Sequence, residues 1–61
     1  MTIRVYNVDY KGAGVAVGHG VTADGNEVRF VGPWRPMREV AATLLAMGGS
    51  VEVTVERWQI L

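Results

Sequence analysis

The sequence predicts an α+β domain whose elements follow the order strand, strand, strand, helix, strand. Alternating apolar and polar residues, the pattern of half-buried strands, run through most of the chain. Helical spacing occurs in one place only, residues 35–49, where apolar residues recur at i, i+3, i+4, i+7 and i+10. A helix that follows a three-stranded meander lies across one face or one end of the sheet. We therefore expect one helix packed on a mainly antiparallel sheet.

The size and the cysteine content limit how this domain can be stabilised. The chain has 61 residues, which predicts a single small domain over residues 1–61 that buries only about 60% of its unfolded surface. It has no cysteine and one histidine, so disulfides and ordinary structural metal sites are excluded and no cofactor is expected. Self-association is the remaining common way to stabilise a domain with a small core, and we predict a homodimer.

The charge and the hydropathy exclude several classes of protein. Basic and acidic residues number six each, so the formal net charge is zero, which argues against bulk binding to DNA or to an anionic membrane. Hydrophobic residues make up 49% of the chain, too many for disorder, yet they are too interrupted for a membrane span. The start, Met1–Tyr6, alternates like a strand and does not resemble a signal peptide. The predicted location is the cytoplasm.

The first strand, residues 2–10, is rich in β-branched and aromatic residues. Ile3 and Val5 share one face, but strict alternation would put Asn7 and Asp9 on that face too. The pattern predicts either a bulge near Tyr6, which changes the buried side, or partial cover on both faces.

A turn at residues 11–14 leads to a second strand at residues 15–22. One of its faces carries larger side chains, namely Val15, Val17, His19 and Val21. The other face is almost bare because it carries Ala16, Gly18 and Gly20. Glycine in a strand marks a sharp bend or a close approach to the backbone. We favour a bend at a barrel corner over an occupied groove.

The clearest local signal is Asp24-Gly25 within residues 23–26, which predicts a tight hairpin into a third strand at residues 27–31. Val28 and Phe30 should face inward. Gly32-Pro33 then ends the strand, and Trp34 is expected in the connector before the helix.

The helix has an apolar side and a side of small and charged residues. Its inward stripe consists of Met37, Val40, Ala41, Leu44 and Met47. Pro36 fits the first helical position, and Gly48-Gly49 can end the helix in a left-handed conformation. The opposite side consists of Arg38, Glu39, Ala42, Thr43 and Ala46. Small residues there permit close approach of another surface, although alanine is also simply the best helix former.

The last strand is expected at residues 51–61. Its inward residues are Val51, Val53 and Val55, and its outward residues are Glu52, Thr54 and Glu56. The alternation breaks at Glu56-Arg57, which predicts a bulge or a change of partner strand. If the long outer strands curl, the sheet approaches a small, partly open barrel of the OB or SH3-like kind. If they do not, it is an open four-stranded sheet with one covered face.

Candidate catalytic and phosphate-binding motifs are weak. The glycines of residues 12–14 and 18–20 do not precede a helix, as a phosphate-binding loop requires. His19 shares its strand face with valines, and the spacing does not bring Asp9 or Asp24 to it. Catalysis needs such a neighbour, so we expect that the protein is not an enzyme.

The best-supported hypothesis is a small non-enzymatic protein-interaction module that binds a partner protein as a homodimer. Large aromatic and Arg side chains are typical anchors of interfaces, and an apolar terminus is expected to dock on its own barrel or on a second copy. The predicted partner-binding residues are Trp34, Arg35, Arg38, Ala42, Ala46, Trp58 and Leu61.

The alternative is a small barrel that binds single-stranded nucleic acid. Arginines and aromatic residues on one curved sheet hold such strands by stacking and by backbone contacts. The residues concerned are Arg4, Tyr6, Tyr10, Arg29, Phe30, Trp34, Arg35 and Arg38. The zero net charge argues against this alternative, unless the acidic residues lie on the opposite side of the domain.

Two segments also carry a resemblance to known proteins. Residues 28–38 and 56–61, together with the Arg-rich and Gly-, Ala- and Val-rich composition typical of a GC-rich genome, resemble the small uncharacterised accessory proteins of actinobacterial phages. The resemblance extends over about half of the chain, chiefly in these two segments, and contains no catalytic motif. It implies no particular function.

Overall fold

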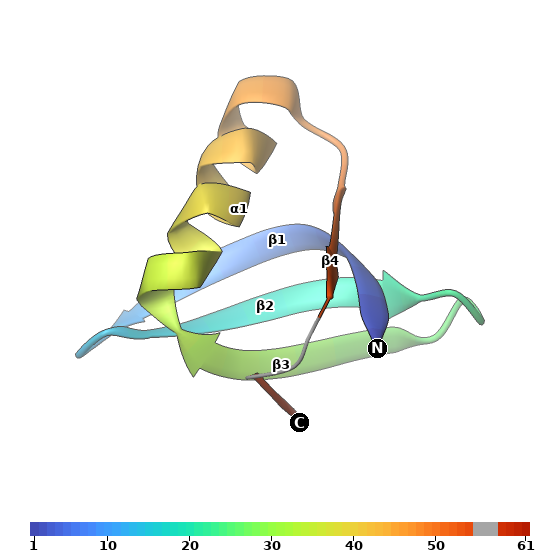
Figure 1. Cartoon of the computed structure of the whole chain (residues 1–61), viewed down its shortest axis with the longest axis horizontal. Coiled ribbons are helices and arrows are strands. Elements are labelled where there is room, and N and C mark those ends of the chain that lie inside the picture. Colours follow the sequence, from blue (N-terminus) through green and yellow to red (C-terminus); the bar gives the residue numbers. More distant parts are fainter. Residues whose placement is uncertain (55–57) are drawn as a thin grey trace.

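The computed structural model describes residues 1–54 and 58–61 and confirms the α+β class. The elements are β1 (Thr2–Gly12), β2 (Val15–Thr22), β3 (Glu27–Pro33), α1 (Trp34–Met47), β4 (Val51–Thr54) and β5 (Gln59–Ile60). All strand pairs are antiparallel. They form one open sheet in the order β4-β1-β2-β3-β5, with α1 on one side of it (Figure 1).

The prediction of a single last strand is wrong, because two short strands lie at opposite edges of the sheet. β4 pairs with residues Thr2–Val5 of β1, whereas β5 pairs with Phe30 and Val31 of β3. The expected change of partner is therefore confirmed. Val51 and Val53 are half-buried and lie opposite buried residues of β1, as predicted for the inward positions. The predicted orientations of Val55 and Glu56, and the break at Glu56-Arg57, lie outside the described residues.

The predicted bulge in the first strand is present. The pairing between β1 and β2 shifts between Val5 and Asn7, so Tyr6 is the extra residue. Ile3 and Val5 are completely or almost completely buried before the shift, and Val8 packs against the core after it. The bulge thus keeps apolar residues on the core side while β1 changes direction.

The bare face of β2 is the core face, and the chain's own side chains fill it. Ala16, Gly18 and Gly20 are all buried. A Cβ atom added at Gly18 would lie 2.6 Å from Cε2 of Phe30, and one added at Gly20 would overlap Cγ2 of Ile3. Glycine is therefore needed because neighbouring strands place large side chains directly on the β2 backbone.

The hairpin between β2 and β3 forms as predicted. The N–H of Gly25 donates to the carbonyl of Thr22 at 2.9 Å, and the N–H of Thr22 donates to the carbonyl of Asn26 at 2.9 Å. Gly25 has φ +84°, which favours glycine over any residue with a side chain.

The helix starts two residues earlier than predicted. Pro33, in extended conformation, is the N-cap residue, and the N–H of Trp34 donates to the carbonyl of Gly14 at 2.8 Å. Trp34 is therefore the first helical residue, and the placement of Pro36 at that position and of Trp34 in a connector is wrong. The predicted end is confirmed: Gly48 has φ +74°, and its N–H donates to the carbonyl of Leu44 at 2.8 Å.

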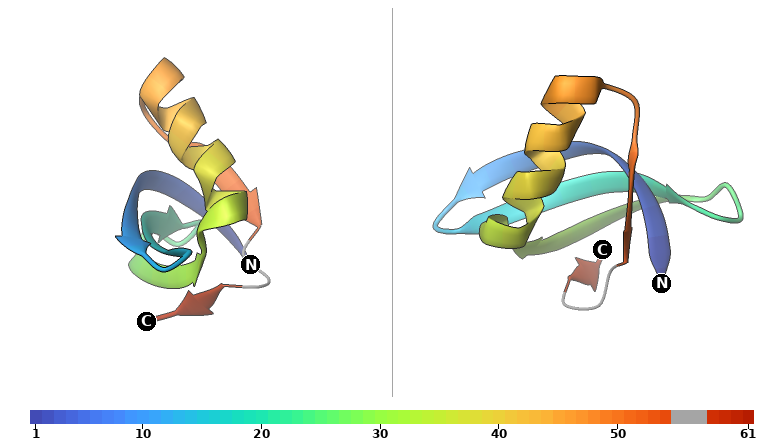
Figure 2. Two further views of the ribbon diagram at one scale, coloured as in Figure 1. Left: turned by 90° about the vertical axis from the view of Figure 1, so that its left-hand side faces the viewer. Right: turned by 45° about the horizontal axis from the view of Figure 1, so that its top comes forward.

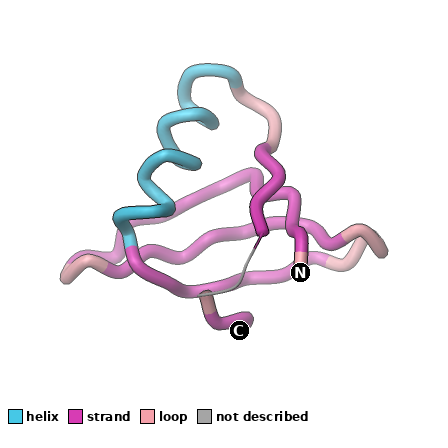
Figure 3. The backbone as a smooth tube through the Cα atoms, viewed as in Figure 1, coloured by secondary structure: helices cyan, strands magenta, loops and turns pink. Residues whose placement is uncertain are grey.

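The core is small, and the last turn of α1 does not reach it. Its buried members are Ile3, Val5, Ala16, Phe30 and Met37. Val40 and Leu44 are half-buried, but Met47 is 81% exposed. The prediction that Met47 faces inward is wrong because α1 runs across the strands and extends beyond β1, so its last turn has no sheet beneath it (Figures 2 and 3).

Candidate interaction surface

An apolar recess lies between α1 and β1, and we call it the helix–β1 groove. It has a volume of about 450 Å³. Its lining residues are Tyr6, Asn7, Val8, Tyr10, Trp34, Ala41, Leu44 and Leu45. The rings of Tyr10 and Trp34 lie 5.0 Å apart between centroids at an interplanar angle of 49°, a tilted arrangement that fixes both aromatic walls relative to each other.

Leu45 stands at the rim of this groove with 90% of its surface exposed. Tyr10, on the opposite wall, is 54% exposed. A single exposed leucine is ordinary on a protein surface. Leu45 borders the recess and its aromatic walls and so adds to their apolar surface, and large apolar patches mark interaction sites.

A stripe of basic, small and apolar residues runs along α1 on the side away from the sheet, and we call it the outer stripe. Its residues are Arg35, Arg38, Ala42, Leu45 and Ala46. All five are exposed. The spacing of three, four and three residues along the first four is that of a helix which packs against another helix. Leu45 belongs to both features, so the outer stripe and the helix–β1 groove form one continuous surface.

The charges of α1 oppose its own dipole. The first turn has no acidic residue and the last turn has no basic residue, while Arg35 and Arg38 lie close to the positive N-terminus. Among the described contacts, neither arginine pairs with a carboxylate. At the C-terminus, the carbonyl of Leu44 accepts the N–H of Gly48. The later carbonyls have no intrahelical donor, so this end offers free acceptors.

The structure brings together five of the seven predicted partner-binding residues. Trp34 is half-buried in the groove. The other four residues from α1 belong to the outer stripe, namely Arg35, Arg38, Ala42 and Ala46. Trp58 instead stacks on Phe30, with ring centroids 5.1 Å apart and planes 13° apart. Leu61 lies beside β3, where its N–H donates to the carbonyl of Arg29 at 2.7 Å. The partner contacts of all seven residues stay predictions.

Sequence reasoning missed Leu45 and Tyr10 as surface residues of this site. The signal for Leu45 is the pair Leu44-Leu45, because two adjacent leucines cannot both face the same side of a helix. The position of Tyr10 on the groove wall depends on the path of α1 over β1, and that path does not follow from local spacing.

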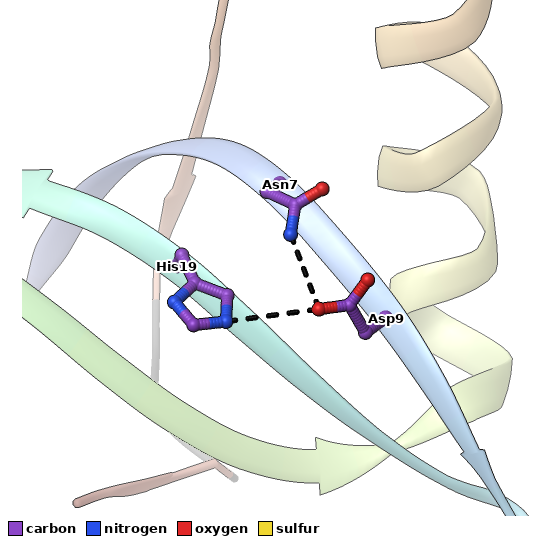
Figure 4. A network of polar contacts seen from close by, with 3 residues as sticks. All are labelled: Asn7, Asp9 and His19. Atoms are coloured by element: carbon purple, nitrogen blue, oxygen red, sulfur yellow. Dashed lines mark hydrogen bonds and ion pairs between the residues drawn. The ribbon is translucent and has the colours of Figure 1, made fainter.

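His19 has an acidic neighbour, contrary to prediction (Figure 4). Its Nε2 lies 3.8 Å from Oδ2 of Asp9, and Nδ2 of Asn7 donates to the same oxygen at 3.2 Å. The cause is the register, in which Asn7 lies opposite His19 and Asp9 lies on the diagonal. Both side chains are partly exposed, His19 at 31% and Asp9 at 47%. Among the hydrogen bonds of the described residues, none joins His19 to a hydroxyl or an amine.

Among the described residues, the arginines divide between two surfaces. Arg4 lies opposite Val21 of β2, and Arg29 lies opposite His19 of β2. Because alternate residues of a strand share a face, Arg4 and Arg29 lie on the sheet face that points away from the core, whereas Arg35 and Arg38 lie on α1. Phe30 is fully buried, which makes it unavailable for stacking on a base. Binding of single-stranded nucleic acid stays a prediction.

Residues 1–54 and 58–61 contain neither a cluster of metal ligands nor a helix that could span a membrane. No group of three His, Cys, Asp or Glu side chains there could hold a metal ion. Within the same residues, α1 is too short and too polar to cross a bilayer. No family model, curated protein or solved structure matches the chain, so the resemblance to phage accessory proteins stays a prediction and function must be inferred from this surface.

Proposed function

We propose that this protein is a non-enzymatic interaction module that binds a partner protein through the outer stripe and the helix–β1 groove. The observation that carries the proposal is Leu45, which is 90% exposed and joins the two features. Full burial of a leucine side chain is worth about 1.5–3 kcal/mol. Leu45 does not gain this stabilisation within its own chain, because the small core does not extend to it.

The composition of the surface supports a protein partner. Tyr10, Trp34, Leu45 and two arginines, Arg35 and Arg38, surround small residues. Aromatic residues and arginine are enriched at the centres of protein interfaces, whereas lysine and glutamate are depleted there. Protein binding therefore explains an apolar surface on a chain with zero net charge better than nucleic-acid binding does.

The two adjacent leucines provide a matched pair of variants. Leu45→Gln is expected to change the free energy of unfolding by less than about 0.5 kcal/mol, because exposed substitutions rarely cost more. Leu44→Gln is expected to destabilise the fold by about 1–2 kcal/mol, because its half-buried side chain packs against the core. Urea denaturation followed by far-UV circular dichroism gives both values. Equal costs would contradict the placement of Leu45 outside the core.

A photo-crosslinking experiment tests the proposed function. A benzophenone amino acid placed at Leu45 is expected to form a discrete protein adduct in an extract of the source cells. The same group at Thr43, which is exposed on another side of α1, serves as the control. Excess unlabelled wild-type protein should suppress an adduct with a different protein, and excess Leu45→Gln should not. An adduct pattern equal to that of Thr43, or equal competition by both proteins, would refute binding through this surface.

A further inference from the structure

We infer that the partner at this surface is a second copy of the chain, whose α1 packs antiparallel against the first α1 along the outer stripe. The inference rests on the proposed function and names the occupant of the same surface. It is carried by the charges of the helix and by the spacing of the stripe.

The electrostatic mismatch within one α1 is resolved by an antiparallel copy. Arg35 and Arg38 lie near the positive end of their own helix, and no basic residue lies in the last turn. A cation is stabilising near a helix C-terminus and not near an N-terminus. In an antiparallel pair, the two arginines at the N-terminus of each helix lie beside the C-terminus of the other helix, where positive charge is favourable. A parallel partner would place four arginines together at one end.

The positions along the helix fit this arrangement. Ala42 is the central small residue of the outer stripe, so we place the two-fold axis beside it. Arg35 lies seven residues before Ala42, about 10 Å along the helix axis, and the last helical residue, Met47, lies five residues or about 8 Å after it. Arg35 of each copy therefore lies just beyond the end of the other helix, towards which the last carbonyls point; these carbonyls have no intrahelical donor.

The apolar contacts fit the same register. Arg38 lies one turn before Ala42, and Leu45 lies about one turn after it. Each Leu45 therefore packs against the alkyl stem of Arg38 from the second copy, while the guanidinium group reaches past it to the helix end. Ala42 at the axis lets the two backbones approach closely. The interface is small, so association is expected in the micromolar range.

Cysteine trapping tests the geometry directly, because the chain has no cysteine of its own. Ala42→Cys is expected to oxidise to a disulfide-linked dimer, since its Cα atoms meet at the axis within the roughly 4.4–6.8 Å that a disulfide needs. Ala46→Cys is the matched control on the same stripe. In the antiparallel register its two copies lie about 12 Å apart along the axis and should stay reduced. Equal trapping at both positions would indicate a parallel pair and overturn the inference.

Light scattering across the micromolar range, up to about 0.5 mM, tests the partner itself. The wild-type protein is expected to shift from monomer to dimer. Arg35→Gln should raise the dissociation constant of the dimer about tenfold. The substitution is present in both copies, so it removes two contacts between an arginine and a helix end. Arg4→Gln, which changes an arginine on β1, should leave the dimer unchanged.

The outcomes separate this inference from the proposed function. A strict monomer throughout the concentration range would overturn the second copy as partner. The proposed function would survive that result if the photo-crosslinker at Leu45 still formed a competed adduct with another protein. A dimer that is insensitive to Arg35→Gln and is not trapped at Ala42 would overturn the antiparallel α1 contact. Failure of the Leu45 crosslink together with a monomer would refute both.

Discussion

Replacing Phe30 by alanine is expected to leave most molecules of the protein unfolded in the absence of denaturant. Phe30 is fully buried, stacks on Trp58 and lies directly on the Gly18 backbone. Truncation of a buried phenylalanine costs about 3–5 kcal/mol. A domain of this length has a total free energy of unfolding of about 3–9 kcal/mol. The loss is therefore comparable to the whole stability of the fold.

Far-UV circular dichroism during urea denaturation is the suitable measurement, because Trp58 fluorescence would respond to the loss of its stacking partner even in a folded chain. Phe30→Leu is the control. It retains most of the apolar volume and should cost less than about 1.5 kcal/mol. A urea midpoint for Phe30→Ala equal to that of the wild type would show that this residue does not hold the core together.

Gly20→Ala is expected to destabilise the fold by about 3 kcal/mol, the upper end of the usual cost of overpacking. The new Cβ would lie 2.8 Å from the carbonyl oxygen of Arg4 and would overlap Cγ2 of Ile3. The carbonyl belongs to the backbone of the paired strand, so relief requires β1 and β2 to separate locally. The thermal midpoint should fall by well over 10 °C. A fall of only a few degrees would contradict so close an approach.

Gly18 offers a comparison in which the obstacle is a side chain. A Cβ there would lie 2.6 Å from Cε2 and 2.9 Å from Cε1 of Phe30. Gly18→Ala should therefore be less costly in the Phe30→Leu background than in the wild type, with a coupling of about 1–2 kcal/mol. The same Phe30→Leu change should not rescue Gly20→Ala. Rescue of both or of neither would show that the two costs do not come from these neighbours.

The elements of the fold that depend on local chemistry are predictable from the sequence. The hairpin at Asp24-Gly25 follows from its turn residues, and the bulge at Tyr6 follows from a break in alternation. The helix end at Gly48 follows from the glycine pair. These features form because nearby residues determine them, whatever the rest of the chain does.

Features that depend on distant contacts were not predictable. The glycine face of β2 lies in the core because Phe30 and Ile3 arrive from the two neighbouring strands. Met47 is exposed because α1 extends past the sheet, although its spacing matches the inward stripe. The helical spacing predicts which residues share a face, but not how far the surface beneath that face extends.

The candidate surface also combines features that local residues determine with features that depend on distant contacts. Arg35, Arg38 and Ala42 could be assigned to one side of the helix from spacing alone. Leu45 could not be recognised as the centre of the surface, because its place at the rim of the helix–β1 groove depends on the position of β1 beneath α1. The proximity of Asp9 to His19 likewise depends on strand register and not on sequence distance.

The separation of β4 and β5 to opposite edges of the sheet sets an order of folding. β1, β2 and β3 pair through neighbouring segments, whereas β4 must find the beginning of β1 across almost the whole chain. Contacts between distant segments carry a larger loop-closure cost and form late. Until then both outer edges of the meander, at Thr2–Val5 and at Phe30-Val31, have unpaired backbone groups. The rate at which β4 and β5 pair with the sheet therefore determines how long its edges can pair with strands of other molecules.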